Sequence, residues 1–202
     1  DELSLSISFL DDIYAQLFRQ GLQQNPELIV GNSRNYLHLR VKRIELPMDP
    51  EFSDSMVFRT ASPIAFSIEY GSFKEMLRPD DEMYSFMIFR DLMNKSAAFQ
   101  SSRSVTPMEA SINPDWKFDI LTKPQHRHFQ FHPRYAWHKA NVDAYHYTFR
   151  IEAPKELIKV GFYSGFGTQN DKGFGFVDVV HDSKEAFISK KTAGRQEKYK
   201  SG

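Results

Sequence analysis

The sequence predicts an α+β protein, and two kinds of hydrophobic periodicity carry that prediction. Apolar and polar residues alternate in several short segments, as in Leu3–Phe9, which is the period of a half-buried β-strand. Apolar residues recur at helical spacing in others, as in residues 11–22 and 83–93. The predicted order is β-α-β, then strands, helix, strands, helix, strand. Its later part is close to the βαββαβ ferredoxin-like arrangement.

The first predicted domain covers residues 1–31. Its opening strand, Leu3–Phe9, is followed by a helix that starts at Asp11-Asp12, where carboxylates favour the N-terminal dipole, and ends near Leu22. Leu28–Val30 is a second strand. Because a strand needs neighbours and none precedes Leu3, we expect the natural polypeptide to begin upstream and the chain to hold only the remainder of a first ferredoxin-like domain.

The second predicted domain covers residues 32–180 and holds a complete ferredoxin-like unit. A helix opens at Pro79–Glu82 and another at Pro154, and Gly165 can end the latter in the left-handed conformation. Residues 100–114 are polar and predict a loop, and residues 181–202 predict a charged tail or linker. The strands expected here are Tyr36–Leu46, Met56–Thr60, Ile64–Tyr70, Trp116–Thr122, His126–Phe131, Ala144–Glu152 and one near Phe174–Val180.

The composition excludes several classes of protein and of binding site. The formal net charge is zero, so any binding to nucleic acid must come from a local patch of cations. The chain has no cysteine, which excludes disulfides and thiolate metal sites and agrees with a reducing compartment. No apolar run approaches the roughly 18 residues of a membrane span, and no signal peptide is visible. We therefore expect a cytoplasmic protein.

A glycine-rich loop is the sharpest local feature. Five of the ten glycines fall at positions 161, 165, 167, 173 and 175. Glycines let a backbone approach a phosphate and direct its N–H groups at the oxygens. A dinucleotide fingerprint fails because Asn170 stands where glycine is required, and a P-loop fails because Lys172 precedes Gly173. The loop therefore predicts either a phosphate contact or a tight helix-to-strand connection that needs unusual backbone angles.

The segment Lys123–Lys139 combines cations, histidines and aromatic rings without any acid. Cations for phosphates and aromatic faces for bases are what single-stranded RNA binding requires. In a strand, His126, His128, Gln130 and His132 would share one face, and Arg127, Phe129 and Phe131 the other. The alternative is an exposed polar face of a sheet whose other face is core. The residues in question are Lys123, His126, Arg127, His128, Phe129, Phe131, His132, Arg134, Tyr135, Trp137, His138 and Lys139.

Two other chemistries fit less well. His126, His128 and His132 could converge on zinc, but the segment offers neither a cysteine nor a carboxylate. Ser164 lies beside Gly165, yet the nucleophile-elbow pattern would need glycine where Phe162 stands. We expect neither a metal nor another cofactor.

Three ordered motifs resemble one known family. The stretch Gly165-x-Gly167-x5-Gly173-x-Gly175, after Ala153–Lys159, resembles the C-terminal glycine-rich signature of the CRISPR-associated repeat-processing endoribonucleases of the RAMP superfamily. Leu46–Phe52 followed by Phe58–Ile64 resembles the family's F-x-T-x-SPI stretch. Arg78–Glu82, leading into a helix that ends near Lys95, is the third motif. The likeness runs from about residue 5 to 180.

The resemblance implies a function. Members of this family bind the CRISPR repeat transcript and cut it once per repeat without metal, which releases guide RNAs. It implies that Gly165, Gly167, Lys172, Gly173 and Gly175 contact RNA; the segment 123–139 adds Arg127 and Arg134. The family's principal histidine lies in a region that has no counterpart here, so His132, His138 and Lys139 are candidate catalytic residues by chemistry alone.

The expected partner is CRISPR repeat RNA, with other CRISPR effector or adaptation subunits as further candidates. The alternative from a different class is a non-catalytic subunit that holds the repeat end of a guide RNA. Such a subunit could also be a domain fused to a reverse transcriptase and a spacer integrase. A third possibility is an unrelated ferredoxin-like interaction module.

Overall fold

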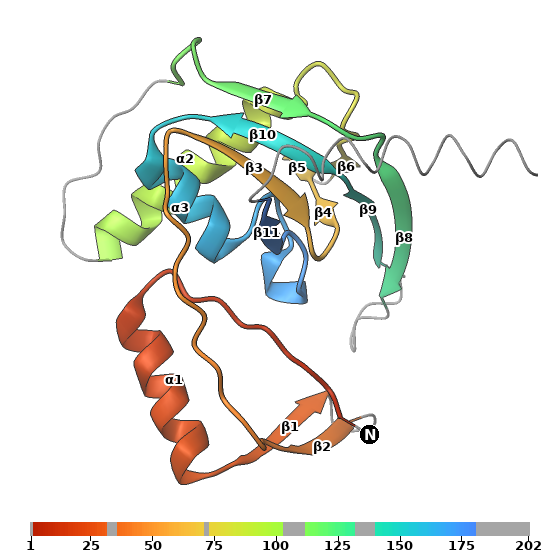
Figure 1. Ribbon diagram of the computed structural model, residues 1–202. Helices are drawn as coiled ribbons and strands as arrows, with labels where there is room; N and C mark the ends of the chain where they lie inside the picture. Colours follow the sequence, from red (N-terminus) through yellow and green to blue (C-terminus); the bar gives the residue numbers. More distant parts are fainter. Residues whose placement is uncertain (1, 32–35, 71–72, 103–111, 132–139, 181–202) are drawn as a thin grey trace, which may run out of the picture. The chain divides into compact units, whose positions relative to one another are not determined.

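The computed structural model describes residues 2–31, 36–70, 73–102, 112–131 and 140–180, and these residues form parts of two compact units, 1–51 and 52–202 (Figure 1). The strand Tyr36–Arg40 pairs with Glu27–Gly31 and so belongs to the first unit, although the sequence analysis assigned residues from 32 onward to the second domain. The predicted tail, 181–202, lies outside the described residues.

The first unit contains helix α1 (Asp12–Gln24) and the antiparallel strands β1 (Glu27–Gly31) and β2 (Tyr36–Arg40). The helix begins where the acidic pair predicted it, because the carboxylate of Asp11 accepts a hydrogen bond of 2.9 Å from the Ile13 N–H. The predicted strand Leu3–Phe9 is wrong: residues 2–9 have no regular secondary structure. Alternation alone does not make a strand, and no described strand pairs with this segment.

The second unit has the ferredoxin-like topology. Its sheet has the order β11-β3-β10-β7, with every neighbouring pair antiparallel. In chain order, the six elements are β3 (Ser55–Thr60), α2 (Tyr84–Ser102), β7 (Lys117–Ile120), β10 (Thr148–Glu152), α3 (Lys155–Ser164) and β11 (Val177–Val179). This is the predicted βαββαβ arrangement with strand order 4-1-3-2, and it confirms the α+β, ferredoxin-like fold class. Helix α2 runs through residue 102, so the predicted loop begins later than residue 100.

Both helices cover the same face of this sheet (Figure 1). Phe58 and Phe149 point from the sheet into one core cluster with Ile88 of α2 and Ile158 of α3, and all four side chains are fully buried. The rings of Phe118 and Phe149 stack with centroids 4.8 Å apart. Burial of such large apolar side chains contributes about 1.5–3 kcal/mol each.

Two insertions extend the basic fold. Between β3 and α2 lie β4 (Ile64–Ala65), β5 (Ser67–Tyr70) and β6 (Phe73–Met76). Between β7 and β10 lies a long antiparallel hairpin of β8 (Gln125–Phe131) and β9 (Ala140–His146). Strand β4 pairs with β9, which makes a second sheet of order β4-β9-β8. No described helix combines the length and apolar composition that crossing a membrane requires.

Candidate nucleic-acid interface

The glycine-rich loop runs from the end of α3 to the start of β11 and contains the short 3-10 helix η1 (Asn170–Lys172). Gly165, Gly167, Gly173 and Gly175 all have φ between 77° and 84°. At Gly165 the ψ angle is 149°, so the predicted left-handed helix end is instead an extended conformation with positive φ, which only glycine adopts readily. Gln169 also has positive φ, at 65°.

Three of these glycines are also required by close packing. A Cβ at Gly165 would lie 2.5 Å from the Asn170 side-chain nitrogen, and one at Gly167 would lie 2.6 Å from the Ala65 carbonyl oxygen. At Gly175 it would lie 2.1 Å from the Phe166 carbonyl oxygen. Gly173 has open space around it. For three glycines, the structure therefore supports the prediction of a tight helix-to-strand connection. Gly173, with open space around it, fits the other prediction, a phosphate contact.

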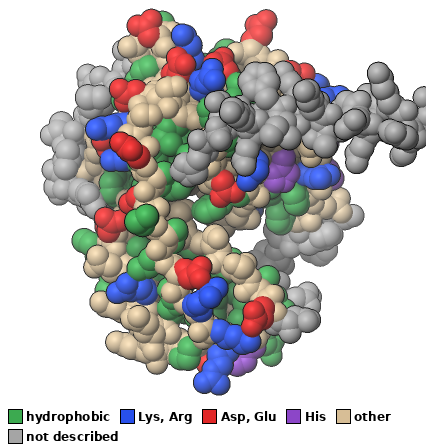
Figure 2. Space-filling view, in the orientation of Figure 1, with side chains coloured by type: hydrophobic (Ala, Val, Ile, Leu, Met, Phe, Trp, Pro, Cys, Tyr) green, Lys and Arg blue, Asp and Glu red, His purple; other side chains and the backbone are tan. Residues whose placement is uncertain are grey.

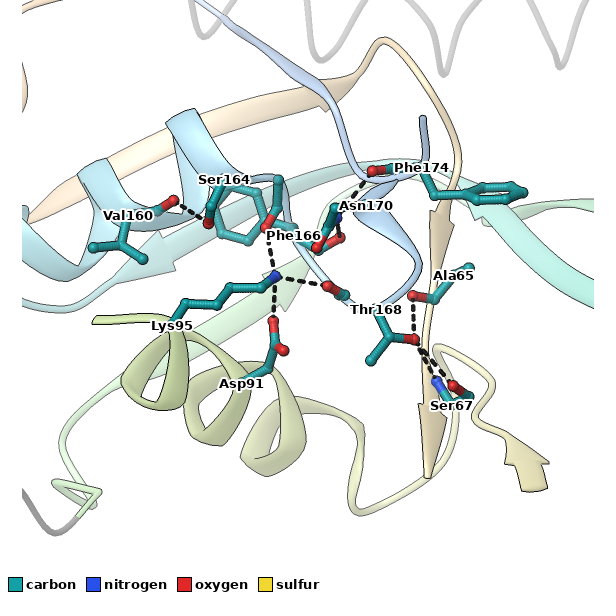
Figure 3. Close-up of polar contacts among 12 residues, drawn as sticks. Ala65, Ser67, Asp91, Lys95, Val160, Ser164, Phe166, Thr168, Asn170 and Phe174 are labelled. Atoms are coloured by element: carbon teal, nitrogen blue, oxygen red, sulfur yellow. Dashed lines mark hydrogen bonds and ion pairs between the residues drawn. The ribbon is translucent and has the colours of Figure 1, made fainter. Parts of the chain in front are cut away.

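Side chains hold the loop in this conformation (Figure 3). The Asn170 amide donates to the Phe174 carbonyl at 2.9 Å and to the Phe166 carbonyl at 3.4 Å. The Thr168 N–H donates to the Ala65 carbonyl at 2.8 Å, and the Thr168 hydroxyl accepts from the Ser67 N–H at 3.0 Å. The loop is thus bonded to itself and to the insertion that follows β3.

Two of the sequence motifs meet at this loop. The Gly175 N–H donates to the Pro63 carbonyl at 3.0 Å, and the Phe176 N–H donates to the Ser62 hydroxyl at 2.8 Å. The Phe176 carbonyl accepts from the N–H groups of Ala61 and Ser62 at 2.8 and 3.0 Å. The F-x-T-x-SPI stretch therefore forms the support on which the last part of the glycine-rich loop lies.

Helix α2, which follows the third motif, reaches the loop through Lys95. Its ammonium group donates to the carbonyls of Gly165 at 2.8 Å and Gly167 at 2.7 Å, and forms an ion pair with Asp91 at 2.6 Å (Figure 3). Burial lowers the pKa of Lys95 and raises the pKa of Asp91, and the attraction between the two charges opposes both shifts. The sequence analysis used Lys95 only to mark the end of a helix.

The exposed part of the loop is short. Asp171, Lys172 and Gly173 are exposed, whereas Gly165, Gly167 and Gly175 are buried. The Lys172 ammonium donates to the Gln169 side-chain oxygen. A ligand arriving from solvent would therefore meet Asp171, Lys172 and Gly173, and the other three glycines shape the backbone behind them.

The β8–β9 hairpin has the two faces that the sequence predicted. His126 and His128 lie on one face, where both imidazoles contact the same carboxylate oxygen of Asp143, at 2.7 and 2.9 Å. The hydrogen bond from His128 lowers the pKa of Asp143 most, and His126 adds to this effect. Phe129 and Phe131 lie on the other face and pack edge-on against Phe174, so the hairpin adjoins the glycine-rich loop.

A histidine that the sequence motifs did not single out, His146, lies on this second face. The His146 Nδ1 lies 3.0 Å from the Thr60 hydroxyl oxygen. This oxygen accepts a hydrogen bond from the Tyr147 N–H at 3.1 Å. Burial lowers the pKa of His146, and the charge of Arg127 lowers it further. Alternation along β9 places His146 on the Phe129 face, but no spacing in the sequence indicated its bond to Thr60.

Four predicted site residues lie outside the described residues, and the Ser164 hydroxyl is bonded within its own helix. His132, Arg134, His138 and Lys139 lie outside the described residues. The Ser164 hydroxyl donates to the Val160 carbonyl of its own helix at 2.6 Å. Within the described part of the chain, no three histidine, aspartate or glutamate side chains are arranged to hold a metal ion.

Charges of both signs are mixed on the face of the molecule that Figure 2 displays. On the face displayed in Figure 2, lysine and arginine side chains are interspersed with aspartate and glutamate, without a broad field of one sign. Any electrostatic attraction for RNA must therefore be local, as the composition indicated.

The fold and the loop define a ferredoxin-like α+β protein with a C-terminal glycine-rich loop. The family described as "CRISPR associated protein Cas6, C-terminal" matches residues 47–179, and the chain belongs to this family. This confirms the family that the three motifs indicated.

Named relatives agree with this assignment. The chain is 29% identical over 192 residues to the CRISPR-associated endoribonuclease Cas6 of Pyrococcus furiosus, covering 93% of the chain and 66% of the relative. It is 25% identical over 187 residues to CRISPR-associated endoribonuclease Cas6 1 of Methanocaldococcus jannaschii, covering 90% and 65%. The chain thus spans just under two thirds of the length of these relatives.

A solved structure supports the fold. The product of a Cas6-related gene from Pyrococcus furiosus superimposes with a TM-score of 0.65 at 19% identity, over 87% of this chain and 67% of that one. This likeness agrees with an arrangement of tandem ferredoxin-like domains.

Proposed function

We propose that this chain belongs to a metal-independent endoribonuclease that binds CRISPR repeat RNA and cleaves it to generate guide RNAs. The observation that carries the proposal is that the F-x-T-x-SPI stretch and Lys95, on the helix that follows Arg78–Glu82, both bond to the glycine-rich loop in a chain of the Cas6 C-terminal family. Two relatives of the same family are named endoribonucleases, which supports this activity.

In the proposed reaction, the ribose 2′-oxygen attacks the adjacent phosphorus while a base removes its proton. The bond from phosphorus to the 5′-oxygen breaks, and an acid protonates that oxygen. The products are a 2′,3′-cyclic phosphate and a 5′-hydroxyl, so neither water nor a metal enters this step. Imidazole suits both proton transfers because its ordinary pKa is about 6.5. His132, His138 and Lys139 remain the candidate catalytic groups.

In the proposed complex, Lys172 and Gly173 contact RNA phosphates from the exposed part of the glycine-rich loop. Gly165, Gly167 and Gly175 give the loop its shape, and Arg127 and Arg134 add positive charge from the hairpin segment. The support is the packing of Phe129 and Phe131 on Phe174, which brings the hairpin beside the loop.

The first test uses the full natural polypeptide and a labelled single CRISPR repeat RNA, incubated with EDTA and resolved on a sequencing gel. We expect one discrete cut that leaves a cyclic phosphate. Tight binding without a cut would favour the alternative, a non-catalytic subunit that holds the repeat end. That subunit could act beside other CRISPR proteins or as a domain fused to a reverse transcriptase and an integrase. If the polypeptide neither binds nor cuts the repeat RNA, both functions are refuted.

A second test concerns the phosphate contacts. Arg127→Ala should weaken RNA binding and reduce the slope of log K against log salt by about 0.7 if it removes one contact with a single strand. Arg90→Ala is the matched control, because Arg90 is an exposed cation of α2 with no place in the proposed interface. An unchanged slope in the Arg127 variant would remove Arg127 from the RNA site.

A further inference from the structure

We infer that Lys95 is a positioning residue for the glycine-rich loop: it binds no RNA itself, but holds the loop in the conformation that RNA contacts. This inference rests on the proposed function, since it assumes that the exposed part of the loop, Lys172 and Gly173, meets phosphate. It assigns a role in RNA binding to a lysine of helix α2.

The geometry ties the Lys95 ammonium group to three protein groups. It donates hydrogen bonds to the carbonyls of Gly165 and Gly167 and forms an ion pair with the Asp91 carboxylate, all within 2.8 Å. The Lys95 side chain is 20% exposed and that of Asp91 is 16% exposed. A cation held by these three groups and this little exposed would have to give up a protein partner to bind RNA. Its effect on RNA therefore has to pass through the loop.

The two carbonyls flank a residue on which the rest of the loop depends. Phe166, between Gly165 and Gly167, is fully buried in the core. Its N–H donates to the Gly175 carbonyl at 2.9 Å, and its own carbonyl accepts from Asn170. The Gly165 carbonyl shares its peptide group with the Phe166 N–H, and the Gly167 carbonyl shares its peptide group with the Thr168 N–H, which donates to the Ala65 carbonyl. Holding these two peptide groups therefore fixes the start of the loop together with its bonds to Gly175 and to Ala65.

Two physical effects follow for a bound phosphate. First, the Gly165 and Gly167 carbonyl oxygens are held on an internal cation, so their negative ends are not turned toward an anionic ligand. Second, glycines lose more conformational freedom on ordering than other residues, so a loop with four of them gains most from being ordered before the ligand arrives. Lys95 supplies this order with one side chain.

Asp91 is the partner that makes a partly buried lysine tolerable. An unpaired ammonium in this position would carry an uncompensated cost of desolvation, whereas the carboxylate four residues earlier on the same helix face compensates part of it. The same pairing restricts the direction in which the ammonium group can point, which directs its remaining N–H groups at the two carbonyls.

The test compares five forms of the full natural polypeptide: wild type, Lys95→Met, Lys95→Arg, Lys172→Ala and the double variant of Lys95→Met with Lys172→Ala. Lys95→Met keeps an unbranched apolar stem and removes the charge. One measurement is the dissociation constant for a repeat RNA with deoxyribose at the cleaved nucleotide. The other, without RNA, is hydrogen exchange at the amides of Thr168 and Gly175, with amides of β10 as the internal reference.

In Lys95→Met we expect RNA binding to weaken by about tenfold to a hundredfold, which is the range for the loss of a hydrogen bond to a charged phosphate. Exchange at Thr168 and Gly175 should become faster while β10 stays protected. In the Lys172→Ala background the effect of Lys95→Met on RNA binding should shrink, because both act through the same loop. Lys95→Arg, which keeps a charge and several donors, should restore part of the affinity.

Different results would refute the role of Lys95 and the proposed function. If wild type binds RNA and Lys95→Met binds it equally well, the inference is wrong while the proposed function stands. The inference is also wrong if the two substitutions reduce affinity independently, or if β10 loses protection as much as the loop. If wild type fails to bind RNA, the proposed function is refuted, and the RNA role of Lys95 with it, even where loop exchange responds to the substitution.

Discussion

Alanine substitutions at three glycines should separate two effects on the free energy of unfolding: the strain of a positive φ and the close contact of the new Cβ with a neighbouring atom. Gly175→Ala incurs both, since φ is 83° and the new Cβ would lie 2.1 Å from the Phe166 carbonyl oxygen. Gly173→Ala incurs only the first, because φ is 84° and no atom lies within 4 Å of the new Cβ. Gly21→Ala, within α1, incurs neither.

The magnitudes follow from these contacts. Placing an L-residue at positive φ costs about 1–2 kcal/mol, which is the whole expected cost for Gly173→Ala. Gly175→Ala must also move the backbone. That movement would break or weaken two hydrogen bonds of residue 175. Its N–H donates to the Pro63 carbonyl, and its carbonyl accepts from the Phe166 N–H; each bond contributes about 1 kcal/mol. We therefore expect a loss of about 3–4 kcal/mol at Gly175. Gly21→Ala should stabilise α1 by about 0.5–1 kcal/mol.

The assay is urea unfolding followed by tryptophan fluorescence. Trp116 packs against Phe89 with ring centroids 5.5 Å apart, so its signal reports on the second unit. The midpoint should fall most in Gly175→Ala, less in Gly173→Ala and not at all in Gly21→Ala, with the slope m unchanged. Equal midpoints for the Gly175 and Gly173 variants would refute the argument, because close contact with Phe166 would then add nothing to the cost of positive φ.

Two further predictions concern the core and the hairpin. The hydroxyls of Tyr84 and Tyr147 are buried and 2.7 Å apart, so Tyr84→Phe leaves the second hydroxyl without this partner and should cost about 1–3 kcal/mol. The double Tyr→Phe variant should cost less than the sum of the single ones, and additive losses in urea unfolding would contradict the pairing. On the hairpin, the pKa of Asp143 is held below its ordinary value of 3.8. Its contribution to stability is therefore present above pH 3.8 and lost as the pH falls through the folded-state pKa. Carboxyl NMR should show this pKa rising in His128→Ala, and an unchanged value would contradict the assigned cause.

The sequence determined the parts of the protein that depend on neighbouring residues. Helical spacing and the acidic pair at Asp11 and Asp12 predicted α1, and the carboxylate of Asp11 does cap it. Alternation along 125–131 correctly separated the histidine face of β8 from the Phe129 face, because side chains on a strand point to opposite sides in turn. The glycine spacing likewise marked positions of unusual backbone geometry, since few other residues tolerate positive φ.

Only the tertiary structure decided which of these elements find partners. Leu3–Phe9 has the pattern of a strand but forms none, because a strand also requires an edge to pair with. The Asp91–Lys95 spacing allowed an ion pair on α2, yet nothing nearby in the sequence shows that Lys95 is enclosed. Its two carbonyl partners lie 70 and 72 residues further along the chain. Contacts of that range arise only when the helix packs beside the loop, so the role of Lys95 could be read from the folded protein alone.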